Sequence, residues 1–276
     1  MTTRSIKLDR QQFGPWAVVT GASSGIGRGF ATQLAASGIN VVLAARRPEP
    51  LEQVGGALAS RYGVRYRAVQ VDLSAPDFMA PLLDATDDLD VGLIVSNAGD
   101  AGLGDFLNAG HNTLLTELRL NAEVHLSLAH HFGQRLTGRG RGGILLVSSL
   151  LAAQGVPYVA NYSATKAYTL VLGESLHHEL APHGVHVTVL VPGPTETPMM
   201  GRLAADKTIM ARMTQPVDAV VAEGLAALKA NRAVRISGVM NRLTVAMAPR
   251  SVRTRIFGTV NKSMVAHVAA REAVVG

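Results

Sequence analysis

The chain of 276 residues has a net charge of +6, a hydrophobic content of 47% and no cysteine. This hydrophobic content is sufficient for a large core and excludes wholesale disorder. The lack of cysteine excludes disulfide scaffolds, thiolate metal sites and cysteine nucleophiles. No apolar run approaches the ~18 residues of a membrane span. The first residues contain no apolar signal segment, so we expect a cytoplasmic protein.

The positive charge is concentrated near the C-terminal end. From Leu225 to Gly276 there are nine basic residues and one acidic residue, so the preceding body is slightly acidic. Aromatic residues make up only 4% of the chain. Because the body is not basic and offers few rings for base stacking, we do not expect nucleic-acid binding.

Six short runs rich in Val, Ile and Leu alternate with longer helical segments. Uninterrupted apolar runs are typical of strands covered on both faces of a parallel sheet. Their alternation with helices predicts an α/β fold with a doubly wound sheet. The predicted strands are Trp16–Thr20, Asn40–Ala45, Tyr66–Val71, Val91–Ser96, Ile144–Ser148 and His186–Val191. The predicted helices are Gly27–Ser37, Pro48–Tyr62, Phe78–Ala85, Thr113–Thr137 and Tyr158–Pro182.

The alternating pattern loosens after Pro192. Residues 193–215 lie between two prolines and contain four methionines. We expect this segment to be a substrate loop with short helices. A helix over Gln215–Ala230 and a last strand over Arg235–Ser237 are predicted to follow. We therefore divide the chain into a catalytic domain, residues 1–236, and a basic C-terminal extension, residues 237–276, with two short helices.

The first predicted strand leads directly into a glycine-rich turn with the sequence Thr-Gly-Ala-Ser-Ser-Gly-Ile-Gly, residues 20–27. Such a turn lets the backbone approach a pyrophosphate, and the helix that follows offers free N–H groups and a positive dipole end. The spacing differs from the Gly-x-Gly-x-x-Gly fingerprint, and alone it could be a simple tight turn. The strand before it and the helix after it favour a phosphate site.

The second predicted strand ends in Arg46 and Arg47. NAD-binding folds place an acidic residue near this position, on the ribose 2′-hydroxyl. Arginine can instead bind the 2′-phosphate of NADP, which a carboxylate would repel. A solvated strand end is the alternative interpretation. Beside the glycine turn, the arginine pair favours NADP as the cofactor.

Tyr162 and Lys166 are four residues apart on a predicted helix, so their side chains share one face. A fixed ammonium favours the phenolate, and we expect Lys166 to lower the pKa of Tyr162 and make it a proton donor. Alone, this pair is often a solvated helix face. Ser149 strengthens the catalytic interpretation because it follows a buried strand, at the edge where ligands bind to parallel sheets. The alternative for this serine is a helix or turn cap.

Taken together, these motifs resemble the short-chain dehydrogenase/reductase family. The resemblance covers residues 16 to about 200 and is specific, because the motifs occur in the family's order. It implies a single Rossmann-like domain. The Ala-Arg-Arg sequence and the tail are similar to the branch of 3-oxoacyl and 17β-hydroxysteroid reductases. The matching residues are Thr20–Gly27, Asn97–Gly99, Asn121, Ser149, Tyr162, Lys166, Pro192, Gly193 and Thr197.

The resemblance implies a role for each matching residue. Tyr162 would be the general acid in reduction and the base in oxidation, and Ser149 would hold the substrate oxygen. Lys166 would tune Tyr162 and bind the nicotinamide ribose, while Asn121 would place a water beside it. The implied cofactor-binding residues are Gly21, Ser23, Ser24, Gly25, Ile26, Gly27, Arg46, Arg47, Asp72, Leu73, Asn97, Ala98, Gly99, Tyr162, Lys166, Pro192, Gly193, Thr195 and Thr197.

The candidate walls of the substrate pocket are mainly apolar, so we expect a small hydrophobic carbonyl or alcohol substrate. Methionine suits irregular hydrophobic ligands, although it is as often a core or lid residue. Acidic residues and histidines do not recur at metal-ligand spacing, and no metal site is predicted. The candidate walls are Leu103, Phe106, Leu150, Leu151, Gln154, Val156, Val159, Met199, Met200, Met210 and Met213.

Three functional interpretations remain open. The leading one is an NADP(H)-dependent oxidoreductase acting on a CH–OH group, and analogy with the family predicts a homo-oligomer. The second is a catalytically silent NADP-binding sensor, although such proteins usually lose the tyrosine or the lysine. The third uses the tail, where Met240, Leu243 and Met247 recur at helical spacing among arginines. This face could bind an anionic membrane or an acyl carrier, or it could pack on the body or a second subunit.

Overall fold

The structure is a computed structural model that describes residues 6–203 and 214–275. A seven-stranded parallel sheet with the order β3-β2-β1-β4-β5-β6-β7 forms its centre. The order reverses between β1 and β4, which confirms the predicted doubly wound α/β fold. The strands are β1 (Trp16–Thr20), β2 (Asn40–Ala45), β3 (Tyr66–Gln70), β4 (Val91–Ser96), β5 (Gly142–Val147), β6 (Val185–Val191) and β7 (Val234–Ile236).

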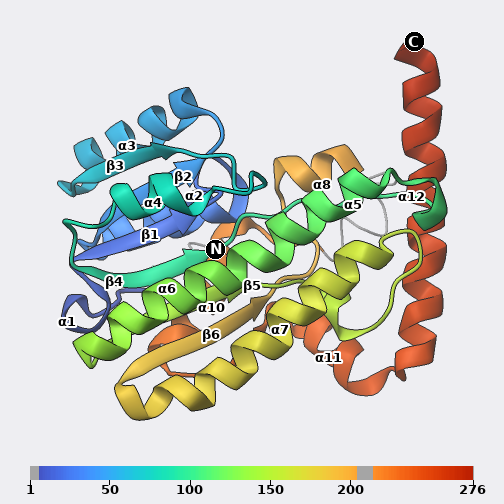
Figure 1. Ribbon diagram of the computed structural model, residues 1–276. Helices are drawn as coiled ribbons and strands as arrows, with labels where there is room; N and C mark the ends of the chain where they lie inside the picture. The colour runs from blue at the N-terminus through green and yellow to red at the C-terminus, as the bar shows by residue number, and fades with distance from the viewer. Residues whose placement is uncertain (1–5, 204–213, 276) are drawn as a thin grey trace.

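Helices cover both faces of the sheet (Figure 1). The core on one face includes residues of α2, α3 and α10, and the core on the other includes residues of α4, α6 and α7. The helices are α1 (Arg10–Phe13), α2 (Gly25–Ala36), α3 (Pro48–Tyr62), α4 (Met79–Asp84), α5 (His111–Leu118), α6 (Val124–Arg139), α7 (Ala160–Leu180), α8 (Pro198–Leu203), α10 (Val217–Lys229), α11 (Val239–Met247) and α12 (Arg250–Val275). Short 3₁₀ turns are η1 (Phe106–Asn108), η3 (Leu150–Ala153) and η4 (Ala181–His183).

The central strands β1, β2, β4 and β5 are mainly apolar because both of their faces are buried. In β1, Val19 packs into the core beneath α2 and α3, whereas its neighbour Val18 packs into the opposite core. In β2, Leu43 packs into the core beneath α2 and α3, and Val42 packs into the opposite core. Successive side chains of a strand point to opposite faces, so a run without polar residues is what a sheet between two helical layers requires.

The helix predicted over Thr113–Thr137 is not continuous. A π-helical turn, η2 (Arg119–Glu123), separates α5 from α6. Within it, the carbonyl oxygen of Asn121 accepts a hydrogen bond from Thr169 Oγ1 of α7, at 3.0 Å. Single π turns inside helices are frequent at functional sites. Apolar periodicity does not reveal such a turn, so the prediction of one unbroken helix was wrong here.

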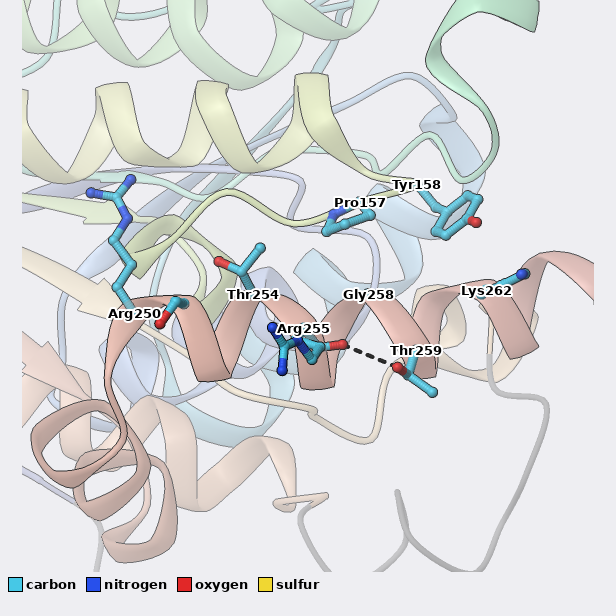
Figure 2. Close-up of a pocket in the computed structure, with 9 residues that line it drawn as sticks. Pro157, Tyr158, Arg250, Thr254, Arg255, Gly258, Thr259 and Lys262 are labelled. Carbon is cyan, nitrogen blue, oxygen red and sulfur yellow. Dashed lines mark hydrogen bonds between the residues drawn. The ribbon is translucent and has the colours of Figure 1, made fainter.

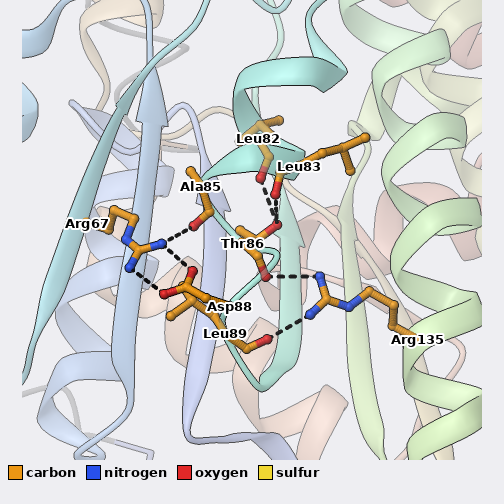
Figure 3. A network of polar contacts seen from close by, with 8 residues as sticks. All are labelled: Arg67, Leu82, Leu83, Ala85, Thr86, Asp88, Leu89 and Arg135. Carbon is orange, nitrogen blue, oxygen red and sulfur yellow. Dashed lines mark hydrogen bonds and ion pairs between the residues drawn. The ribbon is translucent and has the colours of Figure 1, made fainter.

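Two arginines hold the loop that precedes β4 (Figure 3). Arg67 of β3 donates to the carboxylate of Asp88 at 2.7 and 3.1 Å and to the carbonyl oxygen of Ala85 at 2.8 Å. Arg135 of α6 donates to the carbonyl oxygens of Thr86 and Leu89 at 3.1 and 2.7 Å. These bonds fix the edge of the sheet where β4 begins. The candidate site lies on the opposite side of the sheet, at the C-terminal ends of the strands.

The C-terminal extension consists of two helices, as predicted, but α12 has 26 residues and is not short. It lies against the loop between η3 and α7, where Asn261 Nδ2 donates to the carbonyl oxygen of Pro157 at 3.2 Å. The last turns of α12 extend beyond the sheet and its helices (Figure 1). Among the helices described, none combines the length and hydropathy needed to cross a bilayer.

Candidate active site

The predicted motifs meet at the edge of the sheet where the strands end. The glycine turn follows β1, Asn97–Gly99 follows β4, Ser149 follows β5 and Pro192–Thr197 follows β6. Helix α7 then carries Tyr162 and Lys166 past this edge. Ligands bind to doubly wound sheets at this position, beside the point where the strand order reverses. The structure therefore brings residues from five separate segments into one region.

The glycine turn is shaped to hold the backbone close to a phosphate. Gly21 has a φ of 65°, a conformation that favours glycine. A Cβ at Gly27 would collide with the carbonyl oxygen of Gly21, so the turn and the first turn of α2 are in close contact. Ser24, at the N-cap of α2, makes no side-chain capping bond. The N–H groups of the helix start are thus available to an anion, and the residues fit the pyrophosphate of a dinucleotide.

Thr20 fixes the turn to the neighbouring strand end. Its Oγ1 accepts hydrogen bonds from the backbone N–H groups of Asn97 and Ala98 at 2.9 and 3.0 Å, and its carbonyl oxygen accepts from Asn97 Nδ2 at 3.0 Å. Thr197 approaches from the other side, because a Cβ at Gly25 would lie 3.1 Å from its Cγ2. The predicted cofactor residues of β1, β4 and β6 therefore form one continuous wall.

Arg46, Arg47 and Asp72 form the outer corner of this wall. Both arginines are exposed. Asp72 Oδ1 accepts from the Ser74 backbone N–H at 2.9 Å and from Ser74 Oγ at 2.6 Å. These bonds, together with the positive charge of Arg46, hold the pKa of Asp72 below its usual value. An arginine side chain exposed at the end of β2 is what the NADP prediction requires.

The four predicted catalytic residues lie together. Ser149 Oγ accepts a hydrogen bond from the Leu151 backbone N–H at 3.2 Å, and it is near enough to the Tyr162 hydroxyl to affect its pKa. Lys166 Nζ donates to the carbonyl oxygen of Val147 at 3.0 Å and lies 5.9 Å from the centroid of the Tyr162 ring. A Cβ at Gly99 would lie 2.7 Å from Asn121 Oδ1 and 3.0 Å from Lys166 Nζ, so these two groups flank the same glycine.

The electrostatics of this group differ from the expectation. Burial raises the pKa of Tyr162 to about 12, and the nearby Ser149 hydroxyl only partly opposes this. Burial also lowers the pKa of Lys166 to about 8. The prediction that Lys166 leaves Tyr162 with a lowered pKa was wrong, because desolvation of the phenolate outweighs the nearby ammonium. A pattern of residue types cannot show how deeply a group is buried.

Sequence reasoning missed Glu117. Its Oε1 accepts from the Gly102 backbone N–H at 2.8 Å, and its Oε2 accepts from Asn161 Nδ2 at 2.7 Å. This carboxylate raises the pKa of Tyr162 and partly restores that of Lys166. It lies one helical turn before Asn121, so a search along that helix face could have found it.

His125 lies close to this group. Its Nδ1 lies 2.7 Å from Ser96 Oγ, and the ring is fully buried. Burial and the charge of Lys166 lower its pKa well below the usual value. It is one turn after Asn121 on the inward face of α6. We interpret it as a neutral packing residue behind Lys166.

The predicted pocket walls fall into different environments. Four are buried in the folded chain: Leu150, Gln154, Val156 and Val159. These side chains are packed within the protein and do not face an open cavity. Leu103, Leu151, Met199 and Met200 are half-buried, and Phe106 is exposed. Met210 and Met213 lie outside the described residues. Within the described ranges, no three His, Asp or Glu side chains cluster as metal ligands would.

Comparisons with known proteins agree with this geometry. The family model of short chain dehydrogenases matches residues 15–208. A 7beta-hydroxysteroid dehydrogenase of Clostridium sardiniense is 32% identical over 234 residues, 84% of this chain and 89% of that protein. The human inactive hydroxysteroid dehydrogenase-like protein 1 is 31% identical over 66% of this chain and 56% of its own length.

Solved structures show the same architecture. A structure from a study of 7beta-hydroxysteroid dehydrogenase stereoselectivity superposes with a TM-score of 0.85 at 27% identity, covering 90% of this chain and 98% of that one. A short-chain dehydrogenase from Sphingobium yanoikuyae in complex with NADPH superposes with a TM-score of 0.75 at 28% identity, covering 91% and 95%. The extent of the family match, the relatives and the arrangement of the site lead to one conclusion: the chain belongs to the short-chain dehydrogenase family.

Proposed function

We propose that this protein is an NADP(H)-dependent oxidoreductase that interconverts a carbonyl and an alcohol on a hydrophobic substrate. The observation that carries the proposal is the meeting of Ser149, Tyr162 and Lys166 at the same sheet edge as the glycine turn. A phosphate-binding turn and a proton donor at one edge are what cofactor-assisted proton and hydride chemistry requires. The retained Tyr162 and Lys166 argue against the catalytically silent sensor.

The chain's own residues orient the substrate and move the proton. Ser149 Oγ holds the carbonyl oxygen beside the Tyr162 hydroxyl. With a pKa of about 12, Tyr162 is protonated at neutral pH and donates its proton as negative charge develops on that oxygen. Lys166 stabilises the phenolate left behind. Asn121 and Glu117 position α7 and the chain around Gly99 and Gly102. A bound reduced nicotinamide supplies the hydride.

The choice of NADP(H) rests on Arg46 and Arg47. Their guanidinium groups lie at the corner where the adenosine ribose of a dinucleotide on this turn would end. Arginine binds phosphate through two parallel hydrogen bonds. The NADPH complex of the superposing Sphingobium protein supports this choice.

The substrate class is a hydrophobic ketone or secondary alcohol of the hydroxysteroid or 3-oxoacyl type. The half-buried Leu103, Leu151, Met199 and Met200 would supply apolar surface for such a substrate. Relatives with hydroxysteroid dehydrogenase in their names support this class.

Incubation of the purified protein with NADPH and a panel of ketosteroids, 3-oxoacyl thioesters and aromatic aldehydes tests the proposal. Loss of NADPH absorbance at 340 nm reports turnover. We expect reduction of at least one hydrophobic class and a strong preference for NADPH over NADH. Tight NADPH binding without turnover on any class would instead support the sensor.

The proposal extends to assembly and organisation. We propose a cytoplasmic homo-oligomer in which residues 1–236 form the catalytic domain and residues 237–276 form an extension. Exposed Leu126 of α6 and Tyr168 and Val171 of α7 provide a surface for a second copy. In α11, Met240, Leu243 and Met247 are exposed, so contact with a membrane or acyl carrier stays a prediction that liposome and carrier binding assays address.

A further inference from the structure

An open pocket of about 920 Å³ lies between α12 and the loop that precedes α7. Figure 2 shows Pro157 and Tyr158 on the loop side, facing the row of α12 residues from Arg250 to Lys262. None of the roles argued above for the cofactor or the proton donor uses this pocket. Its volume falls within the range of small-molecule sites.

The pocket has a fixed wall. Arg253 is buried and donates to the carbonyl oxygens of Val245 and Ala153 at 3.1 and 3.4 Å. Gly258 lets α12 approach the loop, because a Cβ there would lie 3.0 Å from Pro157 Cγ. Asn261 completes the attachment through its bond to the carbonyl oxygen of Pro157. The start of α12 is therefore held against the chain that connects Ser149 to Tyr162.

The charged side chains that line the pocket are all positive. Arg250, Arg255 and Lys262 contribute three positive charges, and the lining contains hydroxyl groups but no carboxylate. Among the residues that the structure describes, none of these three cations forms an ion pair. A pocket lined by charges of one sign raises the local concentration of ligands of the opposite sign. An anionic group is the ligand that this lining favours.

The pocket is also close to the proton donor. Tyr158, which lines it, precedes Tyr162 by four residues, so their Cα atoms are separated by at most about 15 Å. Tyr158 has a φ of 68°, which is unusual for an aromatic residue, and its carbonyl oxygen accepts from the Gly104 backbone N–H at 2.9 Å. Strained residues of this kind cluster at ligand sites. This separation is within the length of one elongated ligand.

We propose that this pocket binds the anionic end of the substrate while the carbonyl at the other end lies at Tyr162. The substrate would then be an amphipathic ketone or alcohol with a carboxylate, sulfate or phosphate remote from the reacting carbon. This inference rests on the oxidoreductase function proposed above and narrows its substrate class. It assigns α12 a role in substrate selection.

A charge-matched substrate pair tests the proposal. The probes are a ketosteroid with a side-chain carboxylate and its methyl ester, each reduced by the full chain with saturating NADPH. Removing two exposed cations in Arg255→Gln/Lys262→Gln should raise KM for the carboxylate about tenfold, or about 1.4 kcal/mol, with kcat unchanged. KM for the ester should not change. Added salt should raise KM for the carboxylate in the wild type only.

A matched variant and a binding measurement complete the test. Arg232→Gln removes an exposed arginine outside the pocket and should leave both KM values unchanged. Calorimetry of the carboxylate on the Tyr162→Phe protein with NADPH, with and without the double substitution, measures the same contact without turnover. An unchanged NADPH affinity shows that the double variant is folded.

The outcomes separate this inference from the function on which it rests. Equal KM values for acid and ester in the wild type, or an equal rise for both in the double variant, would overturn the anion site while reduction itself stands. Failure to reduce either compound would count against the proposed function. Loss of binding to vesicles of phosphatidylglycerol without any change in KM would reassign the cations to a lipid headgroup and overturn the proposal. Competition by inorganic phosphate alone, with no preference for the acid, would also reject it.

Discussion

Two sides of the candidate site are built by different means: the nucleotide side, around β1 and β2, and the C-terminal side, where α12 meets the loop before α7. Around β1 and β2 the site is made by backbone: a glycine turn, the start of α2 and the bonds of Thr20 to Asn97 and Ala98. On the C-terminal side it is made by side chains of α12 laid against the loop before α7. Backbone geometry leaves a readable sequence pattern, whereas packing between distant segments does not. The motifs of the first side could therefore be recognised from the sequence, whereas the contacts of the second could not.

The two sides meet at Tyr162, and its substitution has the largest expected effect. Tyr162→Phe keeps the ring but removes the transferable proton. General acid catalysis contributes ~10²–10⁴-fold, so kcat should fall at least a hundredfold while NADPH affinity stays nearly unchanged. The exposed Tyr168 lies on the same helix, and Tyr168→Phe serves as the control. Near-wild-type turnover in Tyr162→Phe would remove this residue from the mechanism.

The pH dependence of the unfolding free energy tests whether Lys166 is buried beside Tyr162. The pKa of Lys166 is about 8 in the folded chain and 10.5 for the free side chain. Between these values the unfolded chain holds a proton that the folded chain has lost, so stability rises with pH. One pH unit corresponds to about 1.4 kcal/mol. From pH 8 to 10.5 the unfolding free energy of the wild type should gain about 3 kcal/mol relative to Lys166→Met, measured by denaturant titration without cofactor. If the difference in unfolding free energy between the wild type and Lys166→Met does not change with pH, Lys166 is solvated.

Arg46 tests the nucleotide side alone. A hydrogen bond to a charged group contributes about 1.5–3 kcal/mol, so Arg46→Ala should weaken NADPH binding by about 10- to 100-fold and leave NADH almost unchanged. Fluorescence titration of both cofactors measures this. Arg61→Ala, at the far end of α3, is the control. Equal losses for both cofactors would show that Arg46 and Arg47 are only a solvated strand end.

Asn261 tests the C-terminal side alone and has the smallest expected effect. Asn261→Ala removes the bond to Pro157 and should destabilise the fold by about 1 kcal/mol. The substrate KM should rise a fewfold while the NADPH affinity is retained, because α12 contacts the loop and not the glycine turn. Gln134→Ala on α6 is an exposed control. A matching loss of NADPH affinity would contradict the separation of the two sides.

Most of the fold and the positions of the site motifs could be predicted from the sequence. Unbroken apolar runs identified the strands because the sheet is buried on both faces, and the order of motifs placed Ser149, Tyr162 and Lys166. The π turn at Asn121, whose carbonyl oxygen accepts a hydrogen bond from Thr169 on another helix, leaves no signal in the apolar periodicity. The raised pKa of Tyr162 and the contact of α12 with Pro157 arise only when distant segments pack together.

The central claim is that this chain transfers a hydride between a nicotinamide and a substrate carbon, with Tyr162 supplying the proton. Single-turnover reduction with NADPH deuterated at C4, followed by mass spectrometry of the product, tests it most directly. The account predicts an alcohol that carries deuterium on the carbinol carbon with the wild type, and formation of this labelled alcohol that is about a hundredfold slower or more with Tyr162→Phe, although both proteins bind the cofactor. Binding of the deuterated cofactor without transfer to any ketosteroid, 3-oxoacyl thioester or aromatic aldehyde would contradict it.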